Sequence, residues 1–98
     1  FDAVFANNDD MAIGAILAMK GAGIDMDSVQ VGGGDATSDA LLSMQAGDMD
    51  VPVFQDLAGQ GAGSIDTAIA LINGEEVDKT VFIPFKLVTP DNVADFIQ

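Results

Sequence analysis

The sequence predicts an α/β fold built from βαβ units around a parallel sheet. Short apolar runs typical of strands alternate along the chain with helical segments of roughly 10 to 15 residues, which is the pattern of parallel strands joined by helices. The composition indicates a packed core, because 49% of the 98 residues are hydrophobic and 19% are charged, unlike the polar segments that stay disordered. Right-handed crossovers then place the helices on the faces of the sheet.

The N-terminal segment predicts a strand followed by a helix. Residues 1–6 are an apolar run that ends at two asparagines. From Asp9 to about Ala22, apolar residues recur at helical spacing. Asn8 or Asp9 can cap the start of this helix, and Gly23 can supply the left-handed turn that ends it.

The next segment predicts a second strand and a second helix. A turn over residues 25–27 leads to a strand over 29–34, which ends at Asp35. One of the polar residues 37–39 caps a helix that runs through Ala46, and the glycine that follows closes it.

The second half of the chain predicts two further strands and a helix between them. Residues 51–55 form the third strand, and a glycine-rich connection over 59–63 opens a helix that ends before Gly74. The run 81–88 is a fourth strand, which Pro84 places at an edge or a bulge because proline cannot donate to the ladder.

The C-terminal residues predict a short last helix. Thr89 can act as its N-cap with Pro90 at the first helical position, and the helix runs to Ile97. Four strands are few for a doubly wound sheet, and a strand that starts at residue 1 has no predecessor. We therefore expect the chain to be part of a larger protein.

Apolar side chains of the first two helices are expected to fill the core, with methionine as its flexible filler. The side chains expected to face inward are Met11, Ile13, Ile16, Leu17, Met19, Leu41, Leu42 and Met44.

The charge and the missing residue types exclude several kinds of function. The chain has 3 Lys+Arg against 16 Asp+Glu, a formal net charge of −13, and it contains no His and no Cys. Zinc fingers, thiol proteases, His-based acid–base catalysis and disulfide frameworks need those absent residues. A strongly acidic chain without a basic patch does not bind nucleic acid. We expect no catalytic residue, no metal and no cofactor, and an enzyme on a flavodoxin-like sheet is one alternative.

Two ligand-binding motifs begin but are not completed. The glycines of 59–63 resemble a dinucleotide fingerprint, yet the position that needs the third glycine holds Ser64. Residues 25–27 begin like a calcium loop, but Val29 and Gln30 stand where an oxygen ligand and a glycine are needed.

Polar side chains mark the carboxyl ends of the first three predicted strands. These residues are Asn8, Asp35 and Gln55. In an open α/β sheet, ligands bind in the crevice beyond these ends. A carboxylate accepts hydrogen bonds from two hydroxyls, and an amide donates and accepts in one plane, so the set matches the vicinal hydroxyls of a sugar or polyol.

Each of these residues also has a purely structural explanation. Asn8 could be only a helix N-cap, and Asp35 could be only a loop or cap carboxylate. Gln55 lies in an apolar run, where a buried amide needs partners. Their joint occurrence at successive strand ends favours a binding crevice.

Five motifs in chain order resemble the periplasmic sugar-binding proteins of the ribose/galactose type, which are the solute receptors of ABC importers. Asn8 lies in the motif FANNDDMAIGA, and Asp35 lies in VGGGDATSDA. The resemblance covers essentially the whole chain, although Gly34 stands where relatives often carry Phe or Val, and Ser38 where they often carry Pro. The matching segments are residues 5–15, 31–40, 53–56 with 60–61, 73–75, and 87–89.

The resemblance implies a two-lobed fold of which this chain is the C-terminal third. Asn8, Asp35 and Gln55 would be ligand-binding. Residues 1–56 would belong to the second lobe, 57–88 would return to the first, and 89–98 would cross back. The implied hinge residues are Asp56, Leu57 and Ala58 at one crossing and Thr89 and Pro90 at another. The apolar helix face of Ile65, Ile69 and Ile72 would then lack the sheet on which it packs.

The implied function is delivery of a monosaccharide or polyol to an ABC permease in the membrane. Segments 48–55 and 82–88 are most similar to receptors for inositol and related polyols. The implied location is the periplasm, or the cell surface with a lipid anchor, with an export signal in the full-length protein. A transcriptional regulator of the lactose-repressor type shares the fold and is the alternative.

Overall fold

A computed structural model describes residues 1–97, which form two compact units. The first unit joins Phe1–Gln55 with the described residues from Lys86 onward, and the second is Asp56–Phe85. No helix of the described residues is long and apolar enough to cross a membrane.

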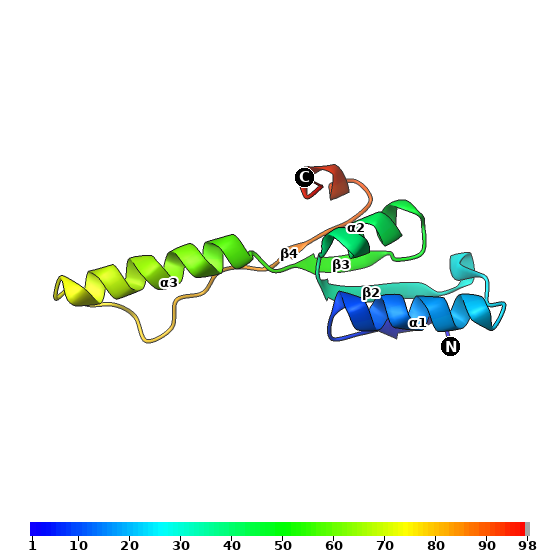
Figure 1. Cartoon of the computed structure of the whole chain (residues 1–98), viewed down its shortest axis with the longest axis horizontal. Helices are drawn as coiled ribbons and strands as arrows, with labels where there is room; N and C mark the ends of the chain where they lie inside the picture. The colour runs from blue at the N-terminus through cyan, green and yellow to red at the C-terminus, as the bar shows by residue number, and fades with distance from the viewer. Residues whose placement is uncertain (98) are drawn as a thin grey trace. The chain divides into compact units, whose positions relative to one another are not determined.

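The first unit is built on one four-stranded sheet with the strand order β1-β2-β3-β4 (Figure 1). The first three strands are parallel neighbours, and β4 is antiparallel to β3. The predicted α/β class with a mainly parallel sheet is therefore confirmed. The strands are β1 (Ala3–Phe5), β2 (Gln30–Asp35), β3 (Val51–Phe54) and β4 (Lys86–Leu87).

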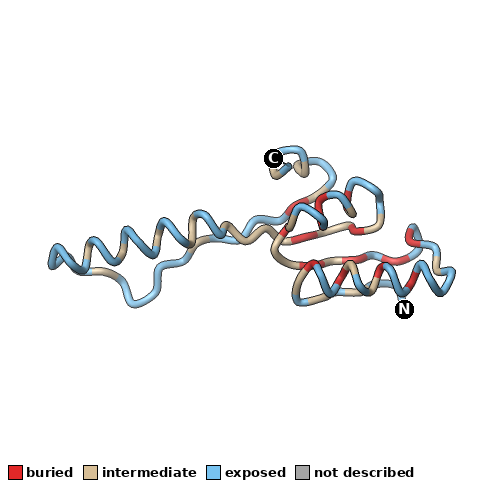
Figure 2. Tube along the Cα trace, viewed as in Figure 1, coloured by how far each residue is buried: buried red, intermediate tan, exposed pale blue. Residues whose placement is uncertain are grey.

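Two helices, α1 (Asp9–Gly21) and α2 (Ser38–Gln45), contact each other and pack on the sheet of this unit. They share one core cluster with β2 and the short 3₁₀ turn η1 (Met26–Ser28), and Figure 2 shows the buried residues gathered along these elements. The cluster consists of Ala12, Ile16, Met19, Met26, Val29, Val31, Ala40 and Met49.

Glycines end the helices as the sequence predicted. Gly23, Gly47 and Gly74 each follow a helix and have positive φ values of 77°, 82° and 76°. Only a residue without a Cβ adopts this conformation at low cost, so these positions fix where the helices stop.

The apolar stripe of α1 and α2 is narrower than the spacing predicted. Met11, Leu17 and Leu42 are exposed, and α1 buries only Ala12, Ile16 and Met19 among its apolar residues. A helix that packs on one sheet face buries residues at i, i+4 and i+7, and the flanking apolar residues stay outside.

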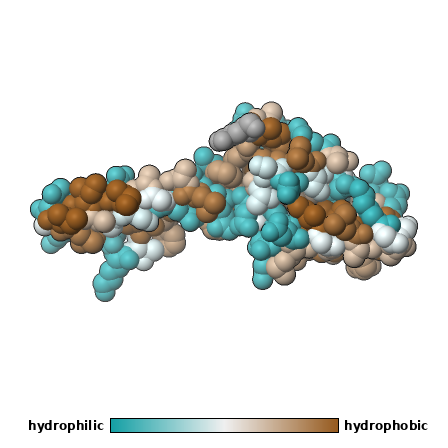
Figure 3. Space-filling model, viewed as in Figure 1, coloured by the Kyte–Doolittle hydropathy of each residue, from teal (hydrophilic) through white to brown (hydrophobic). Residues whose placement is uncertain are grey.

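The second unit consists of helix α3 (Leu57–Ile72) and the irregular segment that follows it. The helix begins before the glycine-rich stretch, so residues 59–63 lie within it and do not form a connecting loop. None of its residues is buried (Figure 2). Figure 3 shows apolar surface along this helix, to which Ile65, Ile69, Leu71 and Ile72 contribute exposed side chains.

Two predicted elements near the C-terminus are shorter in the structure. Of the predicted strand 81–88, only Lys86–Leu87 pairs with the sheet, and residues 81–85, which include Pro84, pair with no strand among the described residues. The predicted last helix is reduced to the 3₁₀ turn η2 (Val93–Asp95). Pro84 has no N–H to donate to a ladder, which agrees with an irregular approach to β4.

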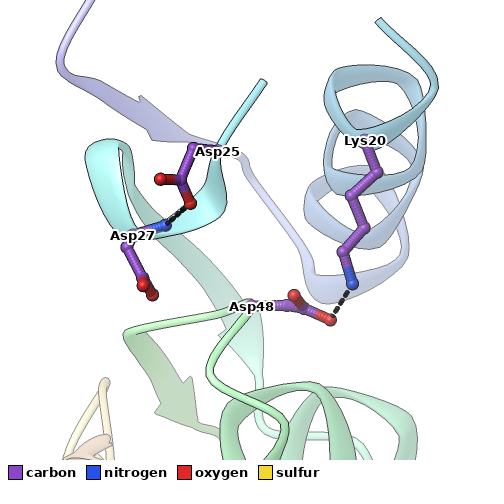
Figure 4. Close-up of polar contacts among 4 residues, drawn as sticks. All are labelled: Lys20, Asp25, Asp27 and Asp48. Atoms are coloured by element: carbon purple, nitrogen blue, oxygen red, sulfur yellow. Dashed lines mark hydrogen bonds and ion pairs between the residues drawn. The ribbon is translucent and has the colours of Figure 1, made fainter. Parts of the chain in front are cut away.

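The acidic turn at residues 25–27 lies just before the start of β2 and makes structural contacts (Figure 4). Asp25 Oδ1 accepts a hydrogen bond from the Asp27 N–H at 3.2 Å and so caps η1. Nearby, Lys20 Nζ forms an ion pair with Asp48 Oδ2 at 2.5 Å, which ties the end of α1 to the loop before β3. Among the described residues, no three His, Cys, Asp or Glu side chains are grouped so that they could hold a metal ion.

Candidate functional site

The three predicted site residues lie at one edge of the sheet. Asp35 is the last residue of β2, Gln55 follows β3, and Asn8 lies three residues after β1. Because β1, β2 and β3 are parallel neighbours, their carboxyl ends meet at the same edge of the sheet. The topology therefore gathers side chains that are 27 and 20 residues apart in the sequence.

Asp35 and Gln55 contact each other directly. Gln55 Nε2 donates a hydrogen bond to Asp35 Oδ1 at 2.6 Å, and the Gln55 N–H donates to the Asp35 carbonyl at 3.4 Å. Both residues are half-buried. Within residues 1–97, no bond occupies Asp35 Oδ2 or Gln55 Oε1, so both acceptors can receive a ligand's hydroxyls.

Asn8 is the N-cap of α1, which confirms the structural explanation of this residue. Its Oδ1 accepts a hydrogen bond from the Met11 N–H at 3.0 Å. That bond fixes the side chain, and the Nδ2 group donates to no residue of the described chain. The cap and a ligand contact are therefore compatible, because they use different atoms of the amide. No hydrogen bond joins Asn8 to Asp35 or Gln55 in the part of the chain described.

The turn that carries Asp35 has an unusual backbone. Asp35 has a φ of 108° and Ala36 a φ of 54°, and they are the non-glycine residues with positive φ among those described. Positive φ is uncommon for residues with a Cβ, and such strain concentrates at functional sites. The next residue, Thr37, is the N-cap of α2, and its Oγ1 accepts a bond from the Ala40 N–H at 3.3 Å.

Asp9 is a buried carboxylate beside this turn that sequence reasoning missed. The sequence indicates only an alternative N-cap at this position, whereas the structure buries the side chain completely. Its Oδ2 accepts a hydrogen bond from the Thr37 N–H at 2.8 Å, and its Oδ1 has no hydrogen-bond partner. The signal for it was the run of three glycines in β2, since glycine in a strand marks the close approach of other atoms.

Electrostatics at Asp9 reflect this burial. Desolvation raises the pKa of the Asp9 carboxyl, the hydrogen bond from the Thr37 N–H lowers it, and the nearby Asp35 carboxylate raises it again. Desolvation is the largest of these effects, so the site contains a carboxylate that is costly to keep charged.

The proposed hinge residues lie where the chain enters and leaves regular structure. Asp56 is the N-cap of α3, and its Oδ1 accepts a bond from the Gly59 N–H at 2.8 Å. Leu57 and Ala58 form the first turn of that helix. The Thr89 N–H donates to Asn92 Oδ1 at 2.8 Å in the turn that contains Pro90.

The three predicted site residues offer hydrogen-bonding groups of two kinds. They are one carboxylate, which accepts hydrogen bonds, and two amides, which both donate and accept them. A carboxylate and amides at a strand edge can orient a polyhydroxylated ligand by several hydrogen bonds at once.

Comparison with known proteins gives consistent matches. The family described as "Periplasmic binding protein domain" matches residues 1–76. A Rhizobium meliloti protein named for rhizopine binding is 62% identical over 96 residues, covering 98% of this chain and 31% of that protein. The chain thus spans about a third of the length of such relatives.

Solved structures agree with these matches. A solute-binding protein from Bacillus halodurans, solved with bound myo-inositol, is 52% identical with a TM-score of 0.87, covering 98% of this chain and 33% of the other. A Caulobacter myo-inositol binding protein, also solved with myo-inositol, is 34% identical with a TM-score of 0.85, covering 96% and 32%.

Proposed function

The chain belongs to the family of periplasmic binding protein domains, and we propose that it forms part of a receptor that binds a monosaccharide or polyol for an ABC importer. The observation that carries this proposal is the hydrogen-bonded pair of Asp35 and Gln55, with Asn8 at the same edge of the sheet. The similar proteins are named as binding or import-binding proteins, which agrees with a role in recognition.

Asp35 is the proposed anchor for the ligand. Its Oδ1 accepts one hydrogen bond from Gln55 and has a second lone pair, and its Oδ2 is open, so each oxygen can accept from a ligand hydroxyl. Bonds from hydroxyls to a carboxylate are charge-assisted and stronger than bonds between neutral groups. Gln55 and Asn8 then orient further hydroxyls, because each amide offers both a donor and an acceptor.

Inositol or a related polyol is the proposed ligand class. Both inositol-bound structures described above share at least a third of their residues with this chain over the matched region. A ring that carries a hydroxyl on every carbon presents adjacent hydroxyls to a carboxylate, whichever face is turned toward it. Asn8, Asp35 and Gln55 carry the hydrogen-bonding groups that adjacent hydroxyls require.

Lobe closure around the ligand is the proposed mechanism. Residues 1–56 and 89–98 would belong to one lobe and 57–88 to the other. The boundaries between the two compact units lie near these positions, at 55/56 and 85/86. Asp56, Leu57, Ala58, Thr89 and Pro90 would absorb the hinge motion. The ligand would stabilise the closed state by its greater affinity for that state, and the closed receptor would contact the membrane permease from the periplasm or the cell surface.

A binding panel tests this function. The full-length gene product containing residues 1–98 should be titrated by calorimetry with myo-inositol, ribose, xylitol and glucose. We expect one site per chain, with the greatest affinity for myo-inositol. A preference for ribose or glucose, which are monosaccharides, would contradict the ligand class, and the absence of heat with every compound would contradict the proposed function.

A further inference from the structure

We propose that the buried carboxylate of Asp9 is a positioning residue, which holds the turn at residues 35–37 in the geometry that presents Asp35 to the ligand. This inference rests on the function proposed above, and it assigns a role to a residue that does not contact the ligand. Asp9 has no solvent exposure, so it acts through its neighbours.

A single hydrogen bond carries the connection. Asp9 lies in the first turn of α1, and its Oδ2 accepts from the Thr37 N–H at 2.8 Å. Thr37 is the N-cap of α2 and lies two residues after Asp35. The bond therefore links the starts of two helices, and the ligand-anchoring Asp35 lies two residues before the linked position.

The turn needs such a restraint. Asp35 and Ala36 both have positive φ values, 108° and 54°, in which a Cβ crowds the backbone. A conformation of this kind persists only where the surrounding structure holds it. If the bond from Thr37 to Asp9 were lost, residues 35 and 36 could relax toward ordinary backbone angles, and the Asp35 carboxylate would move from the sheet edge.

The strand beside Asp9 has a gap that admits this carboxylate. A Cβ at Gly33 would lie 2.5 Å from Asp9 Oδ1 and 3.2 Å from Asp9 Cα, so only glycine leaves room for the side chain. Oδ1 faces this gap without a hydrogen-bond partner. A buried carboxylate with an unpaired oxygen is costly for folding. A contribution to stability therefore does not explain why a carboxylate occupies position 9. Its bond to the turn does explain it.

The adjacent Asp10 provides a matched control. It has the same charge and lies in the same first turn of α1, where both carboxylates interact favourably with the helix dipole. Asp10 is exposed, and no hydrogen bond joins its side chain to any described residue. A difference between the two positions therefore reports the contact with the turn and not the charge at the helix start.

The test uses the full-length gene product with Asp9→Ala, Asp9→Asn and Asp10→Ala, titrated with myo-inositol at a temperature where circular dichroism shows every variant folded. Asp9→Ala removes the acceptor and should weaken binding by about tenfold or more, as expected for the loss of a buried charge-assisted bond. Asp9→Asn keeps an acceptor for the Thr37 N–H and should stay within about threefold of the unchanged protein. Asp10→Ala should bind as the unchanged protein does.

Amide hydrogen exchange of residues 35–37 gives a second measurement that needs no ligand. Asp9→Ala should speed exchange in this turn while α1 and α2 stay protected, and Asp10→Ala should not. A folded Asp9→Ala protein with unchanged affinity and unchanged exchange would overturn the inference. If Asp9→Ala does not fold, a folded Asp9→Asn protein that loses binding by tenfold would also overturn it. If the unchanged protein binds none of the panel compounds, the proposed function fails, and the exchange result still decides the role of Asp9 in the turn.

Discussion

Replacing Asp35 by alanine should remove most of the affinity for the polyol. The substitution leaves two ligand hydroxyls without their acceptor, and it also frees the Gln55 amide that now donates to Asp35 at 2.6 Å. Losing a charge-assisted hydrogen bond costs about 1.5 to 3 kcal/mol, which corresponds to roughly tenfold to a few-hundredfold in the dissociation constant. Calorimetric titration of the full-length protein with myo-inositol measures this change.

Asp39→Ala is the control for that experiment. Asp39 lies four residues away in the first turn of α2 and is exposed, so its carboxylate has no place at the strand edge. Its removal should leave the affinity almost unchanged and cost at most about 1 kcal/mol of stability through the helix dipole. Equal losses of affinity in the two variants would show that ligand binding does not depend specifically on the Asp35 carboxylate.

Gly33→Ala should be the most destabilising of the small substitutions in the first unit. The added methyl would lie 2.5 Å from Asp9 Oδ1 and 3.2 Å from Asp9 Cα, so α1 or β2 has to shift. Overpacking of this kind costs about 1 to 3 kcal/mol. Because the shift also displaces Asp9 from Thr37, the variant should weaken ligand binding as well. Urea unfolding followed by circular dichroism measures the stability term.

Gly14→Ala provides the matched comparison for Gly33→Ala. Gly14 lies in the middle of α1, and a Cβ there would meet nothing within 4 Å. Alanine has the higher helix propensity, so this variant should be more stable by up to about 1 kcal/mol. If both variants change stability by the same amount in the same direction, the close approach between Asp9 and Gly33 has no energetic consequence.

Much of the fold could be predicted from the sequence because local signals and tertiary packing agree. The apolar runs of β1, β2 and β3, the cap at Asn8 and the glycines after the helices each have a local cause that the folded chain retains. The meeting of Asp35 and Gln55 was also predictable, because parallel strands bring their carboxyl ends to one edge.

The features that escaped prediction depend on distant partners. Periodicity could not show that Met11 and Leu17 lie outside the narrow stripe that meets the sheet, because the width of that stripe is set by the neighbouring elements. The burial of Asp9 depends on Gly33, which lies 24 residues away in the sequence. The run 81–88 has the composition of a strand, but a strand also needs a neighbour, and only Lys86–Leu87 pairs within the described chain.

A crystal structure of the full-length protein with myo-inositol tests the central claim most directly. The account predicts that both oxygens of Asp35 lie within about 3 Å of ligand hydroxyl oxygens, with the amides of Asn8 and Gln55 bonded to other hydroxyls of the same molecule. A ligand bound elsewhere, with Asp35 still bonded only to Gln55, would contradict it.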